Sequence, residues 1–266
     1  MVIPTALQFR FYPASLRVTG TTVLNLLDSN LSCPLCPSNQ NGELNLMNDK
    51  IDAVIITHKT YDLIVVDYAS AIDELVSESW IRRFERGLLD SFLLMTKLTK
   101  SDVLDIGCGD GRDTEHLRQK RAVVVAVDYS RSMLIEVRKR IKEGVLCQMD
   151  MRNLGFSSDS FDGVWTNGCI YHVPKTDLGK VLREVLRVLR PLGIFSFNLK
   201  IGIGEQLEEA PRSYKRGPRF YAYYRRREMK DYLEQAGFEF LGIRKYPQKI
   251  LGEEIIHLWC RKPIVV

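Results

Sequence analysis

Hydrophobic positions recur with a regular period from residue 61 onward. Apolar side chains repeat at steps of three and four residues, which predicts two amphipathic helices over 61–76 and 80–93. Short runs rich in valine and isoleucine then alternate with helical segments. The predicted strands are 103–106, 122–127, 145–149, 161–166 and 194–199, and the predicted helices among them are 112–119, 132–142 and 177–190. Strands and helices that alternate in this way predict a parallel sheet.

The C-terminal part follows a different pattern. A helix is predicted over 226–235, closed by Gly237, and two further strands are predicted over 238–246 and 255–261. The connection between these strands is too short for a parallel crossover, so they pair antiparallel. The sequence therefore predicts an α/β fold: a seven-stranded, mostly parallel sheet with helices on both faces and a C-terminal antiparallel hairpin.

The first 46 residues lack this periodicity. They carry four charged side chains, and the stretch 32–42 is rich in the proline, asparagine and glycine typical of loops. We expect a loosely structured extension, 1–46, before one domain, 47–266. Cys33 and Cys36 have the spacing of half a zinc site, but no second pair of ligands follows, and we expect no bound metal.

Composition narrows the class of protein. The chain has 266 residues, of which 45% are hydrophobic and 27% charged, as in ordinary globular proteins. No run approaches the roughly 18 apolar residues of a membrane helix, and the N-terminus lacks the pattern of a secretory signal. Six cysteines are too few and too scattered for a disulfide scaffold. We expect a cytoplasmic protein with reduced thiols and no membrane partner; the oligomeric state stays open.

The net charge of +5 is concentrated in one segment. Residues 212–227 contain seven arginine and lysine residues and no acidic residue, so the rest of the chain is slightly acidic. Aromatic residues are interleaved with these charges, a mixture typical of segments that bind phosphates and stack on bases. The alternative is a solvated loop that leads into the next helix with its aromatic side chains packed inward.

Candidate chemistry begins at the end of the first predicted strand. Residues 103–106 run into a glycine-rich turn, 107–111, that precedes a helix. Glycines let a ligand approach the backbone closely, and the free N–H groups at a helix start attract anions. Asp128 ends the second strand, where a carboxylate can accept hydrogen bonds from two ribose hydroxyls. Asp150 follows the third strand, where it can accept a hydrogen bond from an exocyclic amine.

Other interpretations of these residues remain. A nicotinamide oxidoreductase would use GxGxxG, but Arg112 occupies the position of the third glycine. The turn can also form without any ligand, with Asp105 as a helix cap and Asp150 as an ordinary loop carboxylate.

The glycine turn, Asp128 and the pair Asp150-Met151 resemble motifs of the class I S-adenosylmethionine-dependent methyltransferases of the small-molecule type. The resemblance covers roughly 61–263 and implies a Rossmann-like fold with S-adenosyl-L-methionine as cofactor. The residues that it implies in cofactor binding are Asp105, Gly107, Gly109, Gly111, Asp128, Tyr129, Asp150, Met151, Asn167, Tyr61 and Tyr68. Family members usually have Pro-Gly-Gly before the fifth strand, so Leu192 leaves the type of that turn open.

The resemblance also implies separate tasks for these residues. Asp105 and the glycine turn would hold the methionine moiety, Asp128 the ribose, and Asp150 with the Met151 backbone the adenine. Tyr61 and Tyr68 match aromatic positions of an N-terminal lid helix, although packing in the core explains both of them equally well.

Methyl transfer from a sulfonium depends on alignment, so a dedicated base is optional. His172 follows the fourth strand and is the candidate general base, although in relatives such a histidine often only braces its loop. Asn167, Cys169 and Tyr171 share that loop and are candidates for the methyl channel. We expect a small-molecule acceptor, anionic if the basic segment binds it. RNA is the alternative acceptor, and a non-catalytic cofactor-binding subunit is the alternative function.

Overall fold

The structure, a computed structural model, describes residues 52–77, 79–96, 100–209, 217–247 and 252–264. The predicted extension 1–46, with Cys33 and Cys36, lies outside these residues. The elements in chain order are α1 (Ala53–Ser77), α2 (Ser79–Met95), β1 (Asp102–Ile106), α3 (Arg112–Gln119), β2 (Val123–Asp128), α4 (Arg131–Arg140), β3 (Val145–Gln148), β4 (Phe161–Thr166), the 3-10 helix η1 (Ile170–His172), α5 (Lys175–Val188), β5 (Leu189–Lys200), β6 (Glu205–Glu209), β7 (Pro218–Ala222), α6 (Arg226–Ala236), β8 (Glu239–Lys245) and β9 (Ile255–Arg261). Within the described ranges, no helix is long and apolar enough to cross a membrane.

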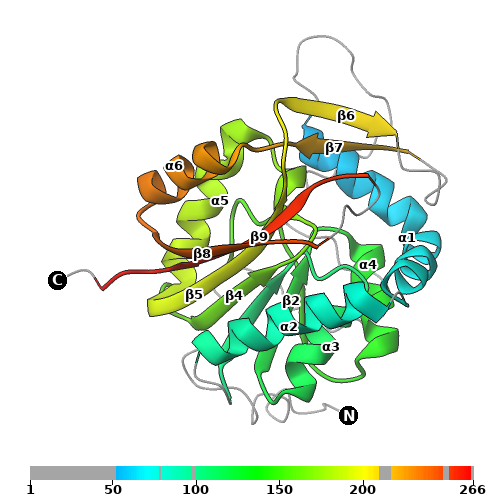
Figure 1. The fold of residues 1–266 in the computed structure, drawn as a ribbon. Helices are drawn as coiled ribbons and strands as arrows, with labels where there is room; N and C mark the ends of the chain where they lie inside the picture. The colour runs from blue at the N-terminus through cyan, green and yellow to red at the C-terminus, as the bar shows by residue number, and fades with distance from the viewer. Residues whose placement is uncertain (1–51, 78, 97–99, 210–216, 248–251, 265–266) are drawn as a thin grey trace.

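The main sheet confirms the predicted fold class (Figure 1). Its strand order is β3-β2-β1-β4-β5-β9-β8, in which the first five strands are parallel and β9 and β8 complete the antiparallel hairpin. The strand order reverses direction between β1 and β4. In open α/β sheets, ligands bind beyond the carboxyl ends of the strands at such a reversal, so this edge is where a site is expected.

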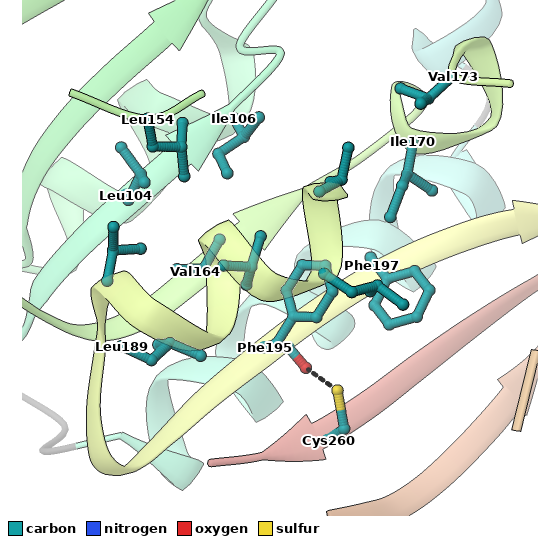
Figure 2. Close-up of a cluster of buried hydrophobic side chains, with 14 of the residues drawn as sticks. Leu104, Ile106, Leu154, Val164, Ile170, Val173, Leu189, Phe195, Phe197 and Cys260 are labelled. Atoms are coloured by element: carbon teal, nitrogen blue, oxygen red, sulfur yellow. Dashed lines mark hydrogen bonds between the residues drawn. The ribbon is translucent and has the colours of Figure 1, made fainter. Parts of the chain in front are cut away.

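Helices cover both faces of the sheet because both faces of its central strands are apolar. Successive strand residues point to opposite sides. Leu104, Val164 and Phe195 belong to the larger core, which the helices α5 and α6 cover (Figure 2). Their chain neighbours Val103 and Trp165 belong to a second core beneath α2 and α3. Burial on two sides explains why these strands appear in the sequence as nearly continuous apolar runs.

The junction between α5 and β5 differs from the prediction. The predicted helix that ends at Arg190 is too long, because β5 already begins at Leu189. Arg190 forms ion pairs of 2.9 Å with both Asp102 and Asp162 and so ties β5 to β1 and β4. Two residues later Leu192 adopts a φ of 66°, so the turn forms without the glycine that the resemblance led us to expect there.

A second, two-stranded sheet was not predicted. β6 and β7 pair antiparallel, and β7 packs against α1 and η1 (Figure 1). Thr60 Oγ1 donates a hydrogen bond to the Pro218 carbonyl (2.6 Å), and the Phe220 N–H donates one to Thr57 Oγ1 (3.0 Å). The described part of the basic segment 212–227 therefore contains a strand that packs on α1, where the sequence suggested a loop.

Gly163 allows a test of the packing between β4 and α2. A Cβ at this position would lie 2.5 Å from Phe92 Cζ and 3.0 Å from Thr96 Cγ2, inside the core. We expect Gly163→Ala to lower the free energy of unfolding by about 1–3 kcal/mol, as overpacked cores do, in urea denaturation.

The matched control is Gly87→Ala in the middle of α2, where nothing lies within 4 Å of the added Cβ. Here the higher helix propensity of alanine should raise the free energy of unfolding by about 0.5–1 kcal/mol. Equal effects of the two substitutions would contradict the packing argument.

Candidate active site

A pocket of about 730 Å³, partly open to solvent, lies between α1 and the carboxyl ends of β1, β2, β3 and β4. Its walls come from the turns after these four strands and from one face of α1. The lining residues are Val54, Thr57, His58, Tyr61, Tyr68, Ile106, Gly107, Gly109, Asp128, Tyr129, Ser130, Met133, Met149, Asp150, Met151, Asn167, Gly168, Cys169, His172 and Val173. The structure thus brings together every predicted site residue except Asp105, Gly111 and Tyr171.

Asp128 is held rigidly at the wall of the pocket. The backbone N–H of Gly109 donates to one carboxylate oxygen (2.9 Å), and the N–H of Ser130 donates to the other (2.8 Å). Burial nevertheless raises the pKa of Asp128 to about 6. The glycine turn that supplies one of these donors needs glycine at Gly107, since its φ is 68° and a Cβ would overlap the Cys169 sulfur.

Asp105 and Gly111 support the turn from outside the pocket lining. Asp105 is buried, and Thr114 Oγ1, in the first turn of α3, lies 2.5 Å from its carboxyl oxygen. Burial, together with the charge of Asp113, raises the pKa of Asp105 to about 8. Gly111 has a φ of 85° at the start of α3, and a Cβ there would lie 2.8 Å from Val137 of α4. Contact of either residue with a cofactor stays a prediction.

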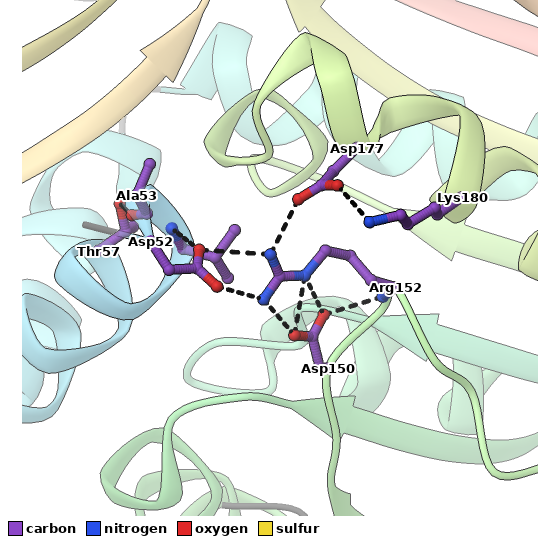
Figure 3. A network of polar contacts seen from close by, with 8 residues as sticks. Asp52, Ala53, Thr57, Asp150, Arg152, Asp177 and Lys180 are labelled. Carbon is purple, nitrogen blue, oxygen red and sulfur yellow. Dashed lines mark hydrogen bonds and ion pairs between the residues drawn. The ribbon is translucent and has the colours of Figure 1, made fainter. Parts of the chain in front are cut away.

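Asp150 faces the pocket but is already engaged by an arginine that the sequence analysis missed (Figure 3). Arg152 Nη2 lies 2.7 Å from one Asp150 oxygen, and the same guanidinium contacts Asp52 (2.9 Å) and Asp177 (3.0 Å). Asp52 in turn accepts a hydrogen bond from the Val54 N–H (2.9 Å) and so caps α1. The network anchors the start of α1 beside the turn after β3. Each Asp150 oxygen accepts two hydrogen bonds from Arg152, so both oxygens are engaged in this structure, and contact of Asp150 with a cofactor stays a prediction.

His172 has both ring nitrogens in hydrogen bonds. Nδ1 lies 2.7 Å from the Phe220 carbonyl, which can only accept, so Nδ1 carries the proton. Nε2 is therefore the acceptor for the Tyr61 hydroxyl at 3.0 Å. Burial lowers the pKa of His172 to about 3, and the nearby charges of Arg219 and Lys200 act in the same direction. The candidate base is thus a neutral imidazole whose free electron pair points at Tyr61.

Asn167 uses its side chain to fix its own loop. Its amide nitrogen donates to Asp113 (3.1 Å) on α3, and its amide oxygen accepts from Asn198 (2.5 Å) on β5. Asn198 also accepts from the Gly168 N–H (2.7 Å). These bonds hold the start of the turn after β4 against the pocket. Both polar atoms of the Asn167 side chain are engaged in them, so Asn167 contributes to the pocket wall mainly through its backbone.

The face of α1 that lines the pocket supplies residues that the sequence analysis did not identify. Thr57 and His58 line the pocket with Tyr61, and the His58 ring stacks on Tyr129 at 4.5 Å between centroids. Asp62 accepts hydrogen bonds from Ser130 Oγ (2.6 Å) and from a backbone N–H at the start of α4. The available signal was the helical spacing of polar and ring side chains along 54–68.

Comparison with known proteins gives a consistent result. Residues 103–193 match the family model described as a methyltransferase domain. Methyltransferase GfsG of Streptomyces halstedii is 38% identical over 98 residues, or 34% of each chain. The malonyl-(acyl-carrier protein) O-methyltransferase of Enterobacter lignolyticus is 34% identical over 95 residues, which cover 36% of this chain and 37% of that protein. The matched region is about a third of the length of these curated relatives.

Solved structures show the same fold. The 1,6-didemethyltoxoflavin-N1-methyltransferase of Burkholderia thailandensis, determined with S-adenosylhomocysteine, aligns with a TM-score of 0.58 at 23% identity, over 78% of this chain and 91% of that one. The magnesium protoporphyrin IX methyltransferase of Synechocystis, determined with S-adenosylmethionine, gives a TM-score of 0.60 at 14% identity, over 81% and 99%.

The neutral state of His172 predicts a pH dependence of stability. Unfolding exposes an imidazole with a pKa near 6.5, whereas the folded pKa is about 3, so the unfolded chain binds the extra proton between these values. This contribution to stability is present above pH 6.5 and is lost as the pH falls. Between pH 7 and pH 5, the free energy of unfolding of the wild type should therefore fall by about 2 kcal/mol more than that of His172→Asn, which has no imidazole at this position.

Urea denaturation of both proteins at pH 7, 6 and 5 makes the measurement. His257 is also buried, with a pKa lowered to about 3, but it contributes equally to both proteins. The same pH slope in wild type and His172→Asn would contradict a buried, neutral His172.

Proposed function

We propose that the chain, whose residues 103–193 match a methyltransferase-domain model, is a class I S-adenosylmethionine-dependent methyltransferase that binds S-adenosyl-L-methionine in the pocket next to α1 and transfers the methyl group to a small acceptor molecule. The observation that carries the proposal is Asp128, whose carboxylate two backbone N–H groups fix at the pocket wall. A carboxylate in this place, at the end of the second strand, is suited to accept two ribose hydroxyls.

The chemistry of the pocket fits this cofactor. Asp128 and Asp150 give one part of the lining a negative character, which suits a ligand with a sulfonium and an ammonium group. Met133 and Met149 add apolar surface, against which a heterocyclic base can pack.

The residues of this chain have the task of alignment. The bound cofactor supplies a methyl group on a good leaving group, so the reaction needs the acceptor atom placed in line and water excluded. Tyr61 donates to His172 Nε2 and accepts a hydrogen bond from Arg219, which leaves one lone pair of its phenolic oxygen for an acceptor O–H or N–H. An imidazole with a pKa near 3 is a weak base, so this pair orients a proton more than it removes one.

A small acceptor fits better than RNA. Three of the similar proteins are named for a substrate, a malonyl group on an acyl-carrier protein, a toxoflavin precursor and magnesium protoporphyrin IX, and these names support a small methylated group. The RNA alternative drew on the basic segment, but there Arg219 is buried and Arg226 pairs with Glu254 at 3.2 Å. We also propose a cytoplasmic location, because the four described cysteines are free thiols, as in reducing compartments.

Loss of the Asp128 carboxylate should weaken cofactor binding. We expect Asp128→Ala to reduce the affinity for S-adenosylhomocysteine by roughly 1.5–3 kcal/mol, the contribution of hydrogen bonds to a charged group. Calorimetry measures this, with the exposed Asp231→Ala on α6 as the matched control. Unchanged affinity in Asp128→Ala, or tighter binding of NAD than of S-adenosylhomocysteine by the wild type, would count against the proposal.

Turnover separates an enzyme from a cofactor-binding subunit. Incubation with methyl-labelled S-adenosylmethionine and cell extract, fractionated into small molecules, RNA and protein, should place the label in the small-molecule fraction. The label should be absent when Asp128→Ala replaces the wild type at low cofactor concentration. Label in the RNA fraction would favour the RNA alternative, and the absence of label from every fraction would favour a non-catalytic subunit.

A further inference from the structure

Two segments that are far apart in the sequence form neighbouring walls of the pocket. Gly107 belongs to the glycine turn after β1, and Cys169 belongs to the segment 167–169 after β4; both residues line the pocket. The two walls touch, because a Cβ on Gly107 would overlap the side chain of Cys169. A shift of segment 167–169 would therefore change the space beside the glycine turn.

Asp113 connects these two walls by a second route. It lies in the first turn of α3, the helix that directly follows the glycine turn. One of its carboxylate oxygens, Oδ2, accepts a hydrogen bond from the Asn167 amide nitrogen (3.1 Å) and another from Trp165 Nε1 (2.9 Å). Trp165 lies in β4, and Asn167 is the first residue after that strand. Asp113 therefore ties the start of α3 to the start of segment 167–169.

The opposite side of segment 167–169 is fixed by Asn198 of β5. This side chain is buried; its amide nitrogen donates to the Asn167 amide oxygen (2.5 Å), and its amide oxygen accepts from the Gly168 N–H (2.7 Å). Asn167 is thus held from two sides, with its nitrogen toward a carboxylate and its oxygen toward an amide. Asp113 and Asn198 together fix the orientation of the Asn167 side chain.

A second cavity, between α2 and α3, lies on the other side of Asp113. Asp113 lines this cavity together with Glu85 of α2, and neither residue is among those that line the pocket. Glu85 also hydrogen-bonds the Asn167 side chain. Burial and the charge of Asp113 raise the pKa of Glu85 to about 7, and the charge of Arg112 acts in the opposite direction. Asp113 therefore acts on a ligand in the pocket through the residues that it holds.

We infer that Asp113 is a positioning residue, which holds segment 167–169 through Asn167 and so sets the space beside the glycine turn for the methionine moiety of the cofactor. The inference rests on the proposed function, since the resemblance assigns that moiety to the glycine turn. The ribose is proposed to bind Asp128, whose carboxylate is fixed by two backbone N–H groups instead. Loss of the Asp113 carboxylate should therefore weaken binding of the amino-acid part of the cofactor and spare the nucleoside part.

The first test compares two ligands of the full chain: S-adenosylhomocysteine and methylthioadenosine, which lacks the amino-acid part. We expect Asp113→Ala to weaken S-adenosylhomocysteine binding about tenfold in calorimetry and methylthioadenosine binding less than about twofold. The matched control is Glu115→Ala on the same helix, which lines the same cavity with a side chain 39% exposed and should change neither affinity. Equal weakening of both ligands or unchanged S-adenosylhomocysteine binding in Asp113→Ala would overturn the inference, as would the same selective loss in Glu115→Ala.

A side-chain swap tests the contact between positions 113 and 167 directly. It decides the question if Asp113→Ala does not fold or if methylthioadenosine binds too weakly to measure. Asn167→Asp removes the N–H donor and places a second carboxylate next to Asp113, so S-adenosylhomocysteine binding should weaken about tenfold. The double variant Asn167→Asp/Asp113→Asn returns the donor from the other side of the pair and should bind within about threefold of the wild type. Normal binding by Asn167→Asp, or a double variant that binds no better than Asn167→Asp, contradicts the inference.

The same titrations separate this inference from the proposed function. Failure of the wild type to bind S-adenosylhomocysteine would contradict the proposed function. Normal binding by the wild type, with no selective loss in Asp113→Ala and no recovery in the swap, would contradict the inference alone.

Discussion

The pocket depends on how α1 is held over the carboxyl ends of the strands, and polar contacts hold it. Asp52 at its start binds Arg152, and Asp62 in its third turn accepts hydrogen bonds from the start of α4. Tyr61 reaches His172 on the opposite wall. Leu63, in contrast, is 78% exposed on the outer side. A helix fixed by directional bonds keeps its inner face polar, and this face can then serve as a wall of a binding pocket.

Burial decides the charges inside this enclosure. Without a ligand, burial raises the pKa of Asp128 to about 6 and that of Asp105 to about 8. Each carboxyl group is therefore protonated at a higher pH than it would be in water. A cationic ligand next to Asp128 reverses the effect, because it favours the ionised form. The same burial keeps His172 neutral. Near neutral pH, Asp128 is therefore largely ionised and His172 is neutral, so the end of the pocket next to Asp128 is the negative one.

The sequence predicted the sheet and the strand-end residues because both follow from local patterns. Apolar runs and the glycine turn predict where the strands lie, and the end of the second strand predicts the position of Asp128. Contacts between distant segments left no such pattern. No sequence pattern near Arg152 predicts its hydrogen bond to Asp52, which lies 100 positions earlier in the chain. Arg219 belongs to a basic segment typical of surfaces, yet its strand packs on α1 and buries it.

The proton of the acceptor limits how the proposed methyl transfer can proceed. A neutral acceptor with an O–H group must lose a proton around the time of methyl transfer, and a base with a pKa near 3, as in His172, takes up protons poorly near neutral pH. An acceptor that reacts through an oxyanion has no proton to lose. The weak basicity of His172 therefore favours an acceptor that is already ionised over one that must give up a proton.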